Sequence, residues 1–188
     1  MSETMILRHR LVDRLFHWLF AIAIMALIGT GLLPVFGVDF NWVVIHWISG
    51  VILTLLVVVH IVRSLFWKNL KAMVFQARDF SKAKAGKYSL EQKLMHNFLT
   101  FVTLAAIVTG GLMMVKIDTP FWERNPYWLQ AETWGWVYII HGLMAMVFVS
   151  TIMLHIYFAV RPEKRLYLQA MVKGWVNKDA YLQEHEQE

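Results

Sequence analysis

Four long apolar stretches, separated by polar segments, dominate the pattern of the chain. They cover residues 14–34, 42–66, 94–116 and 134–160. Each is long enough to cross a hydrocarbon layer of about 30 Å, which takes roughly 20 helical residues. Apolar runs of this length are typical of transmembrane helices, not of strands. The pattern therefore predicts one all-α domain over residues 1–188, an integral membrane four-helix bundle that runs up-down-up-down.

Basic residues gather at one end of these predicted helices. Lys and Arg crowd the N-terminus, the loop after the second stretch and the tail from residue 161, whereas only Lys116 and Arg124 lie on the other side. Because basic residues accumulate on the cytoplasmic side of membranes, we expect both termini to be cytoplasmic. The net charge of +5 then reflects topology and contact with anionic membrane lipid, and we expect no nucleic-acid partner.

The tail predicts a short amphipathic helix over residues 163–176. Its apolar positions are Leu166, Leu168, Met171, Val172 and Trp175. A helix of this kind lies in the plane of the membrane surface. Contact with a partner protein is the alternative role for this segment.

Cysteine is absent, and this limits the redox chemistry that the chain can support. Without cysteine, the chain can hold no disulfide, iron–sulfur cluster, thiolate metal site or covalently attached c-type haem. Metal or redox chemistry must therefore depend on the eight histidines.

Two predicted helices carry a histidine near each end. His141 and His155 enclose the uncharged run "GLMAMVFVSTIML", and His46 and His60 repeat the same interval of 14 residues. Fourteen residues at a rise of about 1.5 Å span roughly 21 Å and return to within about 40° of the same helix face. One helix can thus serve two stacked sites. Ionisable side chains in a span are costly and by default mark a functional path.

The predicted topology sorts these histidines into two layers. His46 and His141 form an outer layer, and the inner layer holds four candidates, which are His17, His60, His96 and His155. Two flat cofactors stacked across the membrane suit this arrangement, and haem b is the cofactor held by histidines without cysteine. Zinc is a weaker alternative because no Asp or Glu lies at depth to complete a four-ligand set. Spacing alone allows His155 to pair with His17 or with His60.

Several segments resemble the cytochrome b, or gamma, subunit of respiratory formate dehydrogenases. They are "RLVDRLFHW" (residues 10–18), "IHWISG" (45–50), "KYSLEQK" (87–93), the run from 141 to 160, and "AMVKGWV" (170–176). The chain is similar, more distantly, to the cytochrome b subunit of nickel–iron hydrogenases and to bacterial cytochrome b561. This di-haem superfamily implies a multi-pass protein of the bacterial inner membrane.

The resemblance implies a ligand set for two b haems. A histidine early in the first helix and the later one of the fourth hold the inner haem, and these match His17 and His155. The outer haem takes the residues that match His46 and His141. His60 departs from the formate dehydrogenase pattern, so it is an alternative inner-haem ligand or part of a quinone or proton site.

The resemblance also implies a quinone site, for menaquinone or ubiquinone, near the start of the third helix. The matching positions are Tyr88, Ser89, Glu91 and Gln92. His60, His96 and Glu91 could instead relay protons to the quinone. Haem propionates need cationic partners, for which Arg14 and Arg63 are the first candidates; Arg8, Arg10 and Arg161 also lie at the inner depth, and Arg124 and Lys116 at the outer.

These features predict a membrane electron-transfer subunit. It would carry electrons through two b haems between an outer-face iron–sulfur or multihaem redox partner and a quinone near the cytoplasmic face. The short outer loops cannot hold a catalytic metal centre, so substrate catalysis would belong to another subunit of the complex, which could be a higher oligomer. The alternatives are a stand-alone quinone oxidoreductase of the cytochrome b561 kind and, in a different class, a non-haem membrane anchor or proton-conducting transporter.

Overall fold

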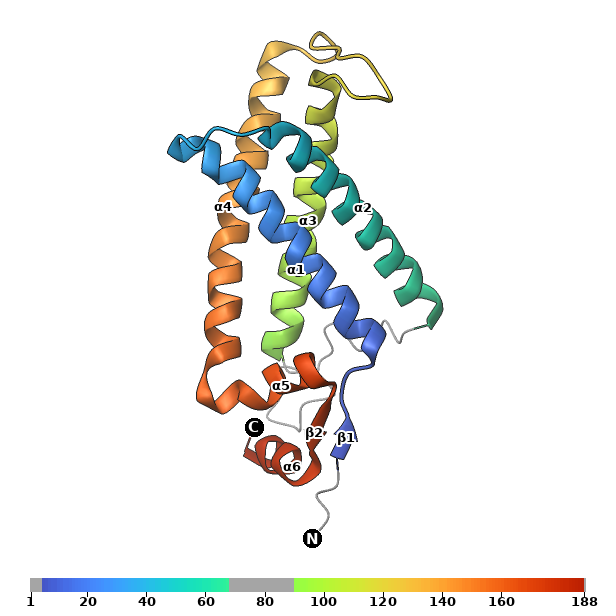
Figure 1. The fold of residues 1–188 in the computed structure, drawn as a ribbon, viewed down its shortest axis with the longest axis vertical. Coiled ribbons are helices and arrows are strands. Elements are labelled where there is room, and N and C mark those ends of the chain that lie inside the picture. Colours follow the sequence, from blue (N-terminus) through green and yellow to red (C-terminus); the bar gives the residue numbers. More distant parts are fainter. Residues whose placement is uncertain (1–4, 68–89, 188) are drawn as a thin grey trace.

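Four long helices form the body of the molecule, in agreement with the predicted all-α membrane bundle (Figure 1). A computed structural model describes residues 5–67 and 90–187. The long helices are α1 (Leu11–Leu32), α2 (Trp42–Trp67), α3 (Leu90–Met113) and α4 (Ala131–Val160). Three of them begin three or four residues before the apolar stretches, because a helix continues beyond hydrocarbon depth into the polar interface, where apolarity is no longer needed.

Short elements cap and connect these helices. They are β1 (Met5–Leu7), the 3-10 turns η1 (Leu33–Phe36), η4 (Met114–Lys116) and η5 (Pro162–Lys164), α5 (Arg165–Lys173), β2 (Trp175–Asn177) and α6 (Lys178–Gln187). After α1, Pro34 opens η1 and Gly37 ends it with a φ of 82°. These two residues turn the chain toward α2 without a long loop.

The long helices pack as two pairs, with α1 mainly against α2 and α3 mainly against α4. Only 11–17 % of the residues in the apolar windows of the four spans are buried within the chain. Large apolar side chains such as Ile22, Phe101 and Met153 are exposed along the spans. A soluble monomer rarely exposes so much contiguous apolar surface. The chain is therefore a multi-pass membrane protein whose outer surface faces lipid.

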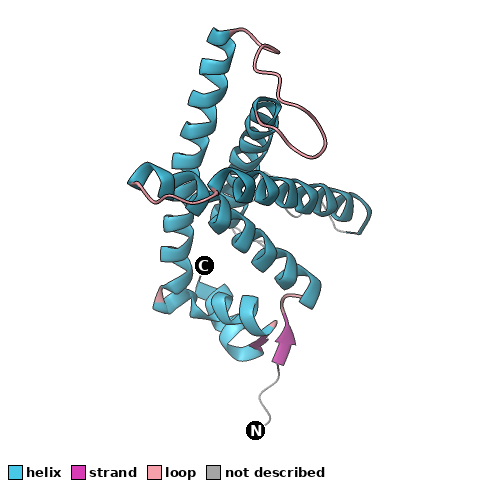
Figure 2. Cartoon of the chain, turned by 45° about the horizontal axis from the view of Figure 1, so that its top comes forward, coloured by secondary structure: helices cyan, strands magenta, loops and turns pink. Residues whose placement is uncertain are grey.

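The N-terminal segment and the tail form a small sheet at one end of the bundle (Figure 1). β1 pairs antiparallel with β2, with Ile6 opposite Val176. The backbone N–H groups of Arg8 and His9 both donate to the carbonyl of Gly174, at 2.9 and 3.2 Å. The two ends of the chain therefore lie together at the end where α1 begins and α4 ends, as the view in Figure 2 also shows.

The expected tail helix is shorter than its sequence pattern indicated. It ends at Lys173 because Gly174 adopts a φ of 90°, a left-handed conformation that stops an α-helix. Trp175 and Val176 belong to β2 instead. The Arg14 guanidinium donates to the carbonyls of Val172 and Lys173. These are carbonyls that the last turn of α5 leaves without helical partners.

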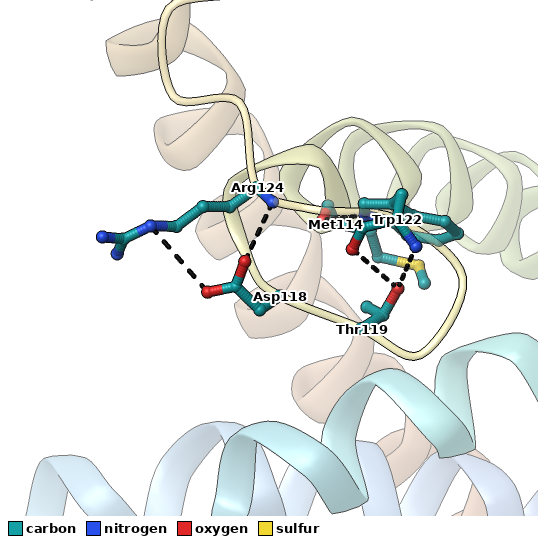
Figure 3. Close-up of polar contacts among 5 residues, drawn as sticks. All are labelled: Met114, Asp118, Thr119, Trp122 and Arg124. Atoms are coloured by element: carbon teal, nitrogen blue, oxygen red, sulfur yellow. Dashed lines mark hydrogen bonds and ion pairs between the residues drawn. The ribbon is translucent and has the colours of Figure 1, made fainter.

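The loop between α3 and α4 is held by its own polar contacts (Figure 3). The backbone N–H of Arg124 donates to the Asp118 carboxylate at 3.0 Å, and the Arg124 Nε lies 3.8 Å from the same group. The Trp122 indole donates to the carbonyl of Met114 at 3.1 Å, and Thr119 faces Trp122 in an isolated β-bridge. The cation of Arg124 thus already has a carboxylate partner.

Replacing Gly174 by alanine should detach the tail from the N-terminal segment. A Cβ there would stand 2.7 Å from an Arg14 nitrogen and 3.0 Å from the His9 carbonyl oxygen, in addition to the positive φ. Gly37→Ala is the matched control, because Gly37 has a similar φ and open space around it. We expect Gly37→Ala to lower the free energy of unfolding by about 1–2 kcal/mol and Gly174→Ala to lower it clearly more. Thermal unfolding in detergent compares the stabilities, and the rate of proteolysis of the tail reports its detachment. Equal effects of the two substitutions would contradict this account of the tail.

Candidate functional site

Six histidines form three ring pairs, and each pair joins one helical hairpin to the other. The ring centroids lie 6.3 Å apart for His17 and His155, 6.2 Å apart for His46 and His141, and 6.3 Å apart for His60 and His96. The first member of each pair comes from α1 or α2, and the second from α3 or α4. The histidine layers expected from the sequence are therefore brought together across the interface between the hairpins.

The separation of the rings indicates how a metal could lie between them. Imidazole nitrogens bind metals at about 2.0–2.1 Å, so two rings on opposite sides of one metal place their centroids about 6.2 Å apart, and a tetrahedral metal would place them about 5 Å apart. All three pairs match the first arrangement. The separations would therefore allow the two rings of a pair to hold one haem iron between them.

The surroundings of the pairs also favour a metal that brings its own equatorial ligands. No group of three or more His, Cys, Asp or Glu side chains that could hold a metal ion occurs in residues 5–67 and 90–187. A tetrahedral zinc site with four protein ligands therefore has no ligand set in this part of the chain. Haem iron needs only the two axial ligands because the porphyrin supplies four. The residues present fit haem.

A threonine fixes the orientation of the His46 ring. The hydroxyl of Thr30 donates to the Ala26 carbonyl at 2.7 Å, and its oxygen lies 2.8 Å from Nδ1 of His46. Because the hydroxyl hydrogen is used on the carbonyl, Nδ1 carries a proton and donates to the threonine oxygen. That tautomer leaves the Nε2 lone pair for a metal.

The same arrangement recurs around His141. The Thr109 hydroxyl donates to the Ala105 carbonyl at 2.7 Å, and its oxygen lies 2.9 Å from Nδ1 of His141. Both threonines are buried, with 5 and 7 % exposure for Thr30 and Thr109. Sequence reasoning missed these two residues. A signal was present in the chain, since a Thr-Gly dipeptide stands in the outer half of both the first and the third stretch.

The glycines of these dipeptides let the histidine rings approach the neighbouring helix. A Cβ added at Gly31 would lie 3.7 Å from Cε1 of His46, an ordinary contact, whereas one at Gly110 would lie 3.2 Å from Cε1 of His141. The second distance is tighter than a normal Cβ contact. A side chain at Gly110 would therefore press on the His141 ring, which would have to shift by a few tenths of an ångström.

The His17–His155 pair lacks such a hydroxyl on the first ring. Nδ1 of His17 is buried and has no hydrogen-bond partner among the described residues. His17 is half-buried and His155 is exposed. The ring of His17 lies edge-on to Trp18 at 5.1 Å. The surroundings of the two pairs therefore differ. Threonine hydroxyls hold both rings of the His46–His141 pair, whereas the His17 ring of the other pair has no such hydrogen bond among the described residues.

His60 lies beside His96 and against two aromatic rings. The Phe16 and Phe20 rings are edge-on to it, with centroids at 6.4 and 6.1 Å. Helical spacing alone left open whether His155 pairs with His17 or with His60, and the resemblance implied His17. The structure brings His155 to His17.

The other predicted site residues are placed as follows. Glu91 and Gln92 are exposed in the first turn of α3, and Tyr88 and Ser89 lie outside the described residues. Arg63 forms an ion pair with Asp13 at 2.7 Å, and Arg14 bonds the end of α5. Three further basic candidates have partners, Arg8 with the Tyr181 hydroxyl, Arg161 with Glu163, and Lys116 with the Trp134 ring. Arg10 is exposed just before α1.

The family assignment follows from comparison with known proteins. The prokaryotic cytochrome b561 family matches residues 8–174 of the chain. This chain belongs to the prokaryotic cytochrome b561 family. It is similar to the formate dehydrogenase cytochrome b556 subunit of Haemophilus influenzae, with 24 % identity over 197 residues that cover 93 % of this chain and 78 % of that protein.

Membership of this family makes the chain a membrane electron-transfer cytochrome that binds haem b. This confirms the predicted cytochrome b family and the choice of haem b. The sequence by itself left open a non-haem membrane anchor or a proton-conducting transporter. The family match replaces this alternative by a cytochrome that binds haem b. The family match includes all four long helices and all six paired histidines.

Removing either threonine hydroxyl should alter the haem environment without unfolding the bundle. We expect Thr30→Val and Thr109→Val to weaken haem retention by roughly 10–100-fold, the usual effect of losing a hydrogen-bond partner of a metal-bound histidine. Each variant should also raise the midpoint potential of the haem that its histidine holds, because the imidazole becomes a poorer electron donor. Redox titration and haem retention during dialysis provide the measurements. Thr30→Ser and Thr109→Ser keep the hydroxyl and should restore both properties, and valine variants identical to wild type would show that the threonines have no positioning role.

A second pair of variants tests the fit of the glycines. Gly110→Ala should displace the His141 ring and lower the haem content of the purified protein, whereas Gly31→Ala should leave it near the wild-type value, because its Cβ has room. Both substitutions favour the helix by about 1 kcal/mol, so differences in helix propensity cancel. Pyridine haemochrome spectra give the haem content, and an equal loss in both variants would contradict the contact at Gly110.

Proposed function

We propose that this cytochrome is an electron-transfer subunit that connects a redox partner at one membrane face with a quinone near the other. Two haems b would be held by His46 with His141 and by His17 with His155. The observation that carries the proposal is that α4 contributes one histidine to each of two ring pairs, and these two histidines stand 14 residues, or roughly 21 Å, apart. Two haems held there would be separated by most of the hydrocarbon thickness.

The orientation of the chain in the membrane belongs to the proposal. The helices would run up-down-up-down in the bacterial inner membrane, with both termini and the loop after α2 in the cytoplasm. The distribution of Lys and Arg supports this orientation. So does the sheet of β1 and β2, which brings the two ends of the chain to the same end of the bundle. In this orientation the His46–His141 pair is the outer site.

Each residue at the two pairs has a definable task. When bound, haem supplies one-electron transfer. Thr30 and Thr109 hold the outer histidines in the Nδ1–H tautomer and increase the electron density of the rings. His17 lacks this support among the described residues. An electron-rich imidazole stabilises the oxidised metal, so the residues favour a lower potential at the outer site than at the inner one, which directs electrons inward.

The proposed partners follow from the size of the loops and from the relative. The connection from 37 to 41 and the loop from 117 to 130 are short, so oxidation of a substrate would take place on another polypeptide. The relative from Haemophilus influenzae is a formate dehydrogenase subunit, which supports an iron–sulfur subunit at the outer face with a dehydrogenase behind it. A multihaem cytochrome is the alternative partner, and such a complex could be a higher oligomer.

Quinone, either menaquinone or ubiquinone, would react near the cytoplasmic end of the bundle. Glu91 and Gln92 are exposed at the start of α3 on that side, as a quinone site between protein and lipid requires. Electrons that come from outside and protons taken from the cytoplasm would together build a membrane potential. Each electron that crosses 100 mV exchanges about 2.3 kcal/mol.

The haem-ligand assignment is tested by quantifying haem in single-histidine variants. His46→Ala should lose one haem per chain with the outer spectral component, and His17→Ala one haem with the inner component, because each haem loses an axial ligand. His9→Ala is the control, since His9 lies before α1 and outside the spans. Reduced-minus-oxidised spectra with pyridine haemochrome quantification give the numbers, and a full haem complement in His17→Ala would overturn the inner assignment.

Isolation of the native protein in mild detergent tests the partner. A complex that oxidises its substrate with quinone supports the subunit proposal. Purification as a lone haem protein that reduces quinone by itself would replace it with the stand-alone oxidoreductase, a function that the family match to almost the whole chain also permits.

A further inference from the structure

We propose that a layer of buried apolar side chains, halfway between the outer and the inner histidine levels, seals the bundle against protons. The proposal rests on the function above, because such a seal matters only where electron transfer charges the membrane. Each long helix contributes one side chain to this central layer, which consists of Ala23, Leu53, Val102 and Phe148. Their exposed fractions are 6, 4, 1 and 7 %, in that order.

On α2 and α4 the central layer lies at the midpoint between two histidines. Leu53 stands seven residues after His46 and seven before His60, and Phe148 divides the interval between the two histidines of α4 in the same way. Seven residues turn a helix by about 700° and advance it by about 10 Å. Each side chain therefore lies within about 20° of the helix face that carries both histidines.

On α1 and α3 the layer has matching positions. Ala23 stands six residues after His17 and seven before Thr30. Val102 stands at the same intervals from the histidine of α3 and from the threonine that bonds His141. Each of the four helices thus carries a polar residue at the outer level, a histidine at the inner level and a buried apolar side chain halfway between them.

Contacts between the helices bring these four midpoints to one depth. At the outer level, two hydrogen bonds and a ring pair connect α1 to α2, α3 to α4 and α2 to α4. At the inner level, ring contacts connect α1 to α4, α2 to α3 and α1 to α2. Every long helix is therefore tied to a neighbour on both sides of the central layer.

Burial of apolar side chains in the spans is concentrated at this depth. Among the described residues of the four long helices, the other buried apolar side chains are Trp134 and Val137, near the start of α4. Packing without a barrier function would bury side chains at any depth. Concentration at one depth, between two sites that would hold cofactors, is what a barrier between those sites requires.

No ionisable side chain bridges the two levels. The segments between them, which are residues 18–29, 47–59, 97–108 and 142–154, contain no Asp, Glu, His, Lys, Arg or Tyr. Thr103 and Thr151 lie close to the layer and are buried, but each hydroxyl donates at 2.7 Å to the carbonyl four residues earlier in its own helix. A hydroxyl hydrogen used in this way is not offered to a neighbouring helix.

Electrons and protons place different demands on such a layer. A proton crosses an apolar region only along a chain of hydrogen-bonded waters or polar side chains. A buried water needs about two to four polar partners, and an apolar constriction excludes water by dewetting. An electron tunnels between metal centres and needs no polar group. The central layer can therefore pass electrons while it stops protons, so the membrane potential is kept.

Passive proton entry into proteoliposomes measures the seal directly. The full-length protein is reconstituted with pyranine inside the vesicles, and a potassium diffusion potential set with valinomycin drives protons inward without any electron donor. Phe148→Asn should raise the rate of proton entry several-fold over wild type, because the smaller amide leaves space and supplies polar partners for water. Phe148→Leu keeps the layer apolar and should show the wild-type rate.

Phe101→Asn is the matched control for the same amide at nearly the same depth. Phe101 directly precedes Val102 on α3, but it is 65 % exposed on the outer surface of the bundle. Its replacement should leave the rate of proton entry at the wild-type value. A rate raised equally in Phe101→Asn and Phe148→Asn would overturn the seal, because the leak would then come from disturbing a helix in lipid.

A milder variant on α2 decides the outcome if Phe148→Asn does not assemble, which loss of haem in pyridine haemochrome spectra would reveal. Leu53→Ser should also leak, whereas Leu55→Ser, at a position that is 60 % exposed, should not. Wild-type proton entry in Leu53→Ser with haem retained would overturn the seal and leave the proposed function intact. A wild-type protein that is proton-tight but builds no potential during quinone reduction would instead overturn the proposed function.

Discussion

The constraint on which the structure depends is the presence of imidazoles inside an apolar bundle. Six histidines stand within the four spans, and each lies beside another histidine across the interface of the two hairpins. A polar ring at such depth is costly unless its nitrogens are bonded. The hairpins contact each other less than the helices within them. The histidine pairs lie at this interface, where a haem held by both rings of a pair would connect the two halves.

The two hairpins are alike around the His46–His141 pair and differ around the His17–His155 pair. In both hairpins a buried threonine bonds Nδ1 of a histidine on the partner helix, and the following glycine allows the ring to approach. The inner level has no equivalent hydroxyl at His17 and holds a second pair, His60 with His96, on the other side of α1. A difference in hydrogen bonding between otherwise similar ligands is a direct means of separating redox potentials. Under the proposed function, this asymmetry would favour electron flow from the His46–His141 site to the His17–His155 site.

The end of the bundle with the chain termini has an organisation of its own. Arg14, on the first turn of α1, bonds the last carbonyls of α5, while β1 pairs with β2. These contacts use cations that the sequence had suggested for haem propionates. Arg63 is similarly paired with Asp13. Exposure of Glu91 and Gln92 at the same end leaves the start of α3 accessible to a lipid-soluble reactant.

The sequence by itself determined the four spans and the position of each histidine along them. Length and apolarity suffice for a helix in lipid because its backbone bonds are satisfied within the segment. The interval of 14 residues on α2 and α4 follows from helical periodicity alone, and the resemblance anticipated the cytochrome b family. Haem ligation by the individual histidines remains a prediction.

Only the tertiary structure decided which histidine meets which. Spacing along one helix does not determine how that helix is rotated against its neighbours, so spacing alone left both His17 and His60 as partners for His155. The resemblance implied His17, and the packed helices bring His17 to His155. Thr30 and Thr109 were missed for the same reason, because their partners are on another helix. The end of α5 at Gly174 depended on a φ of 90° and on contacts with the N-terminal segment. Contacts between distant segments depend on packing geometry, which local pattern and periodicity do not contain.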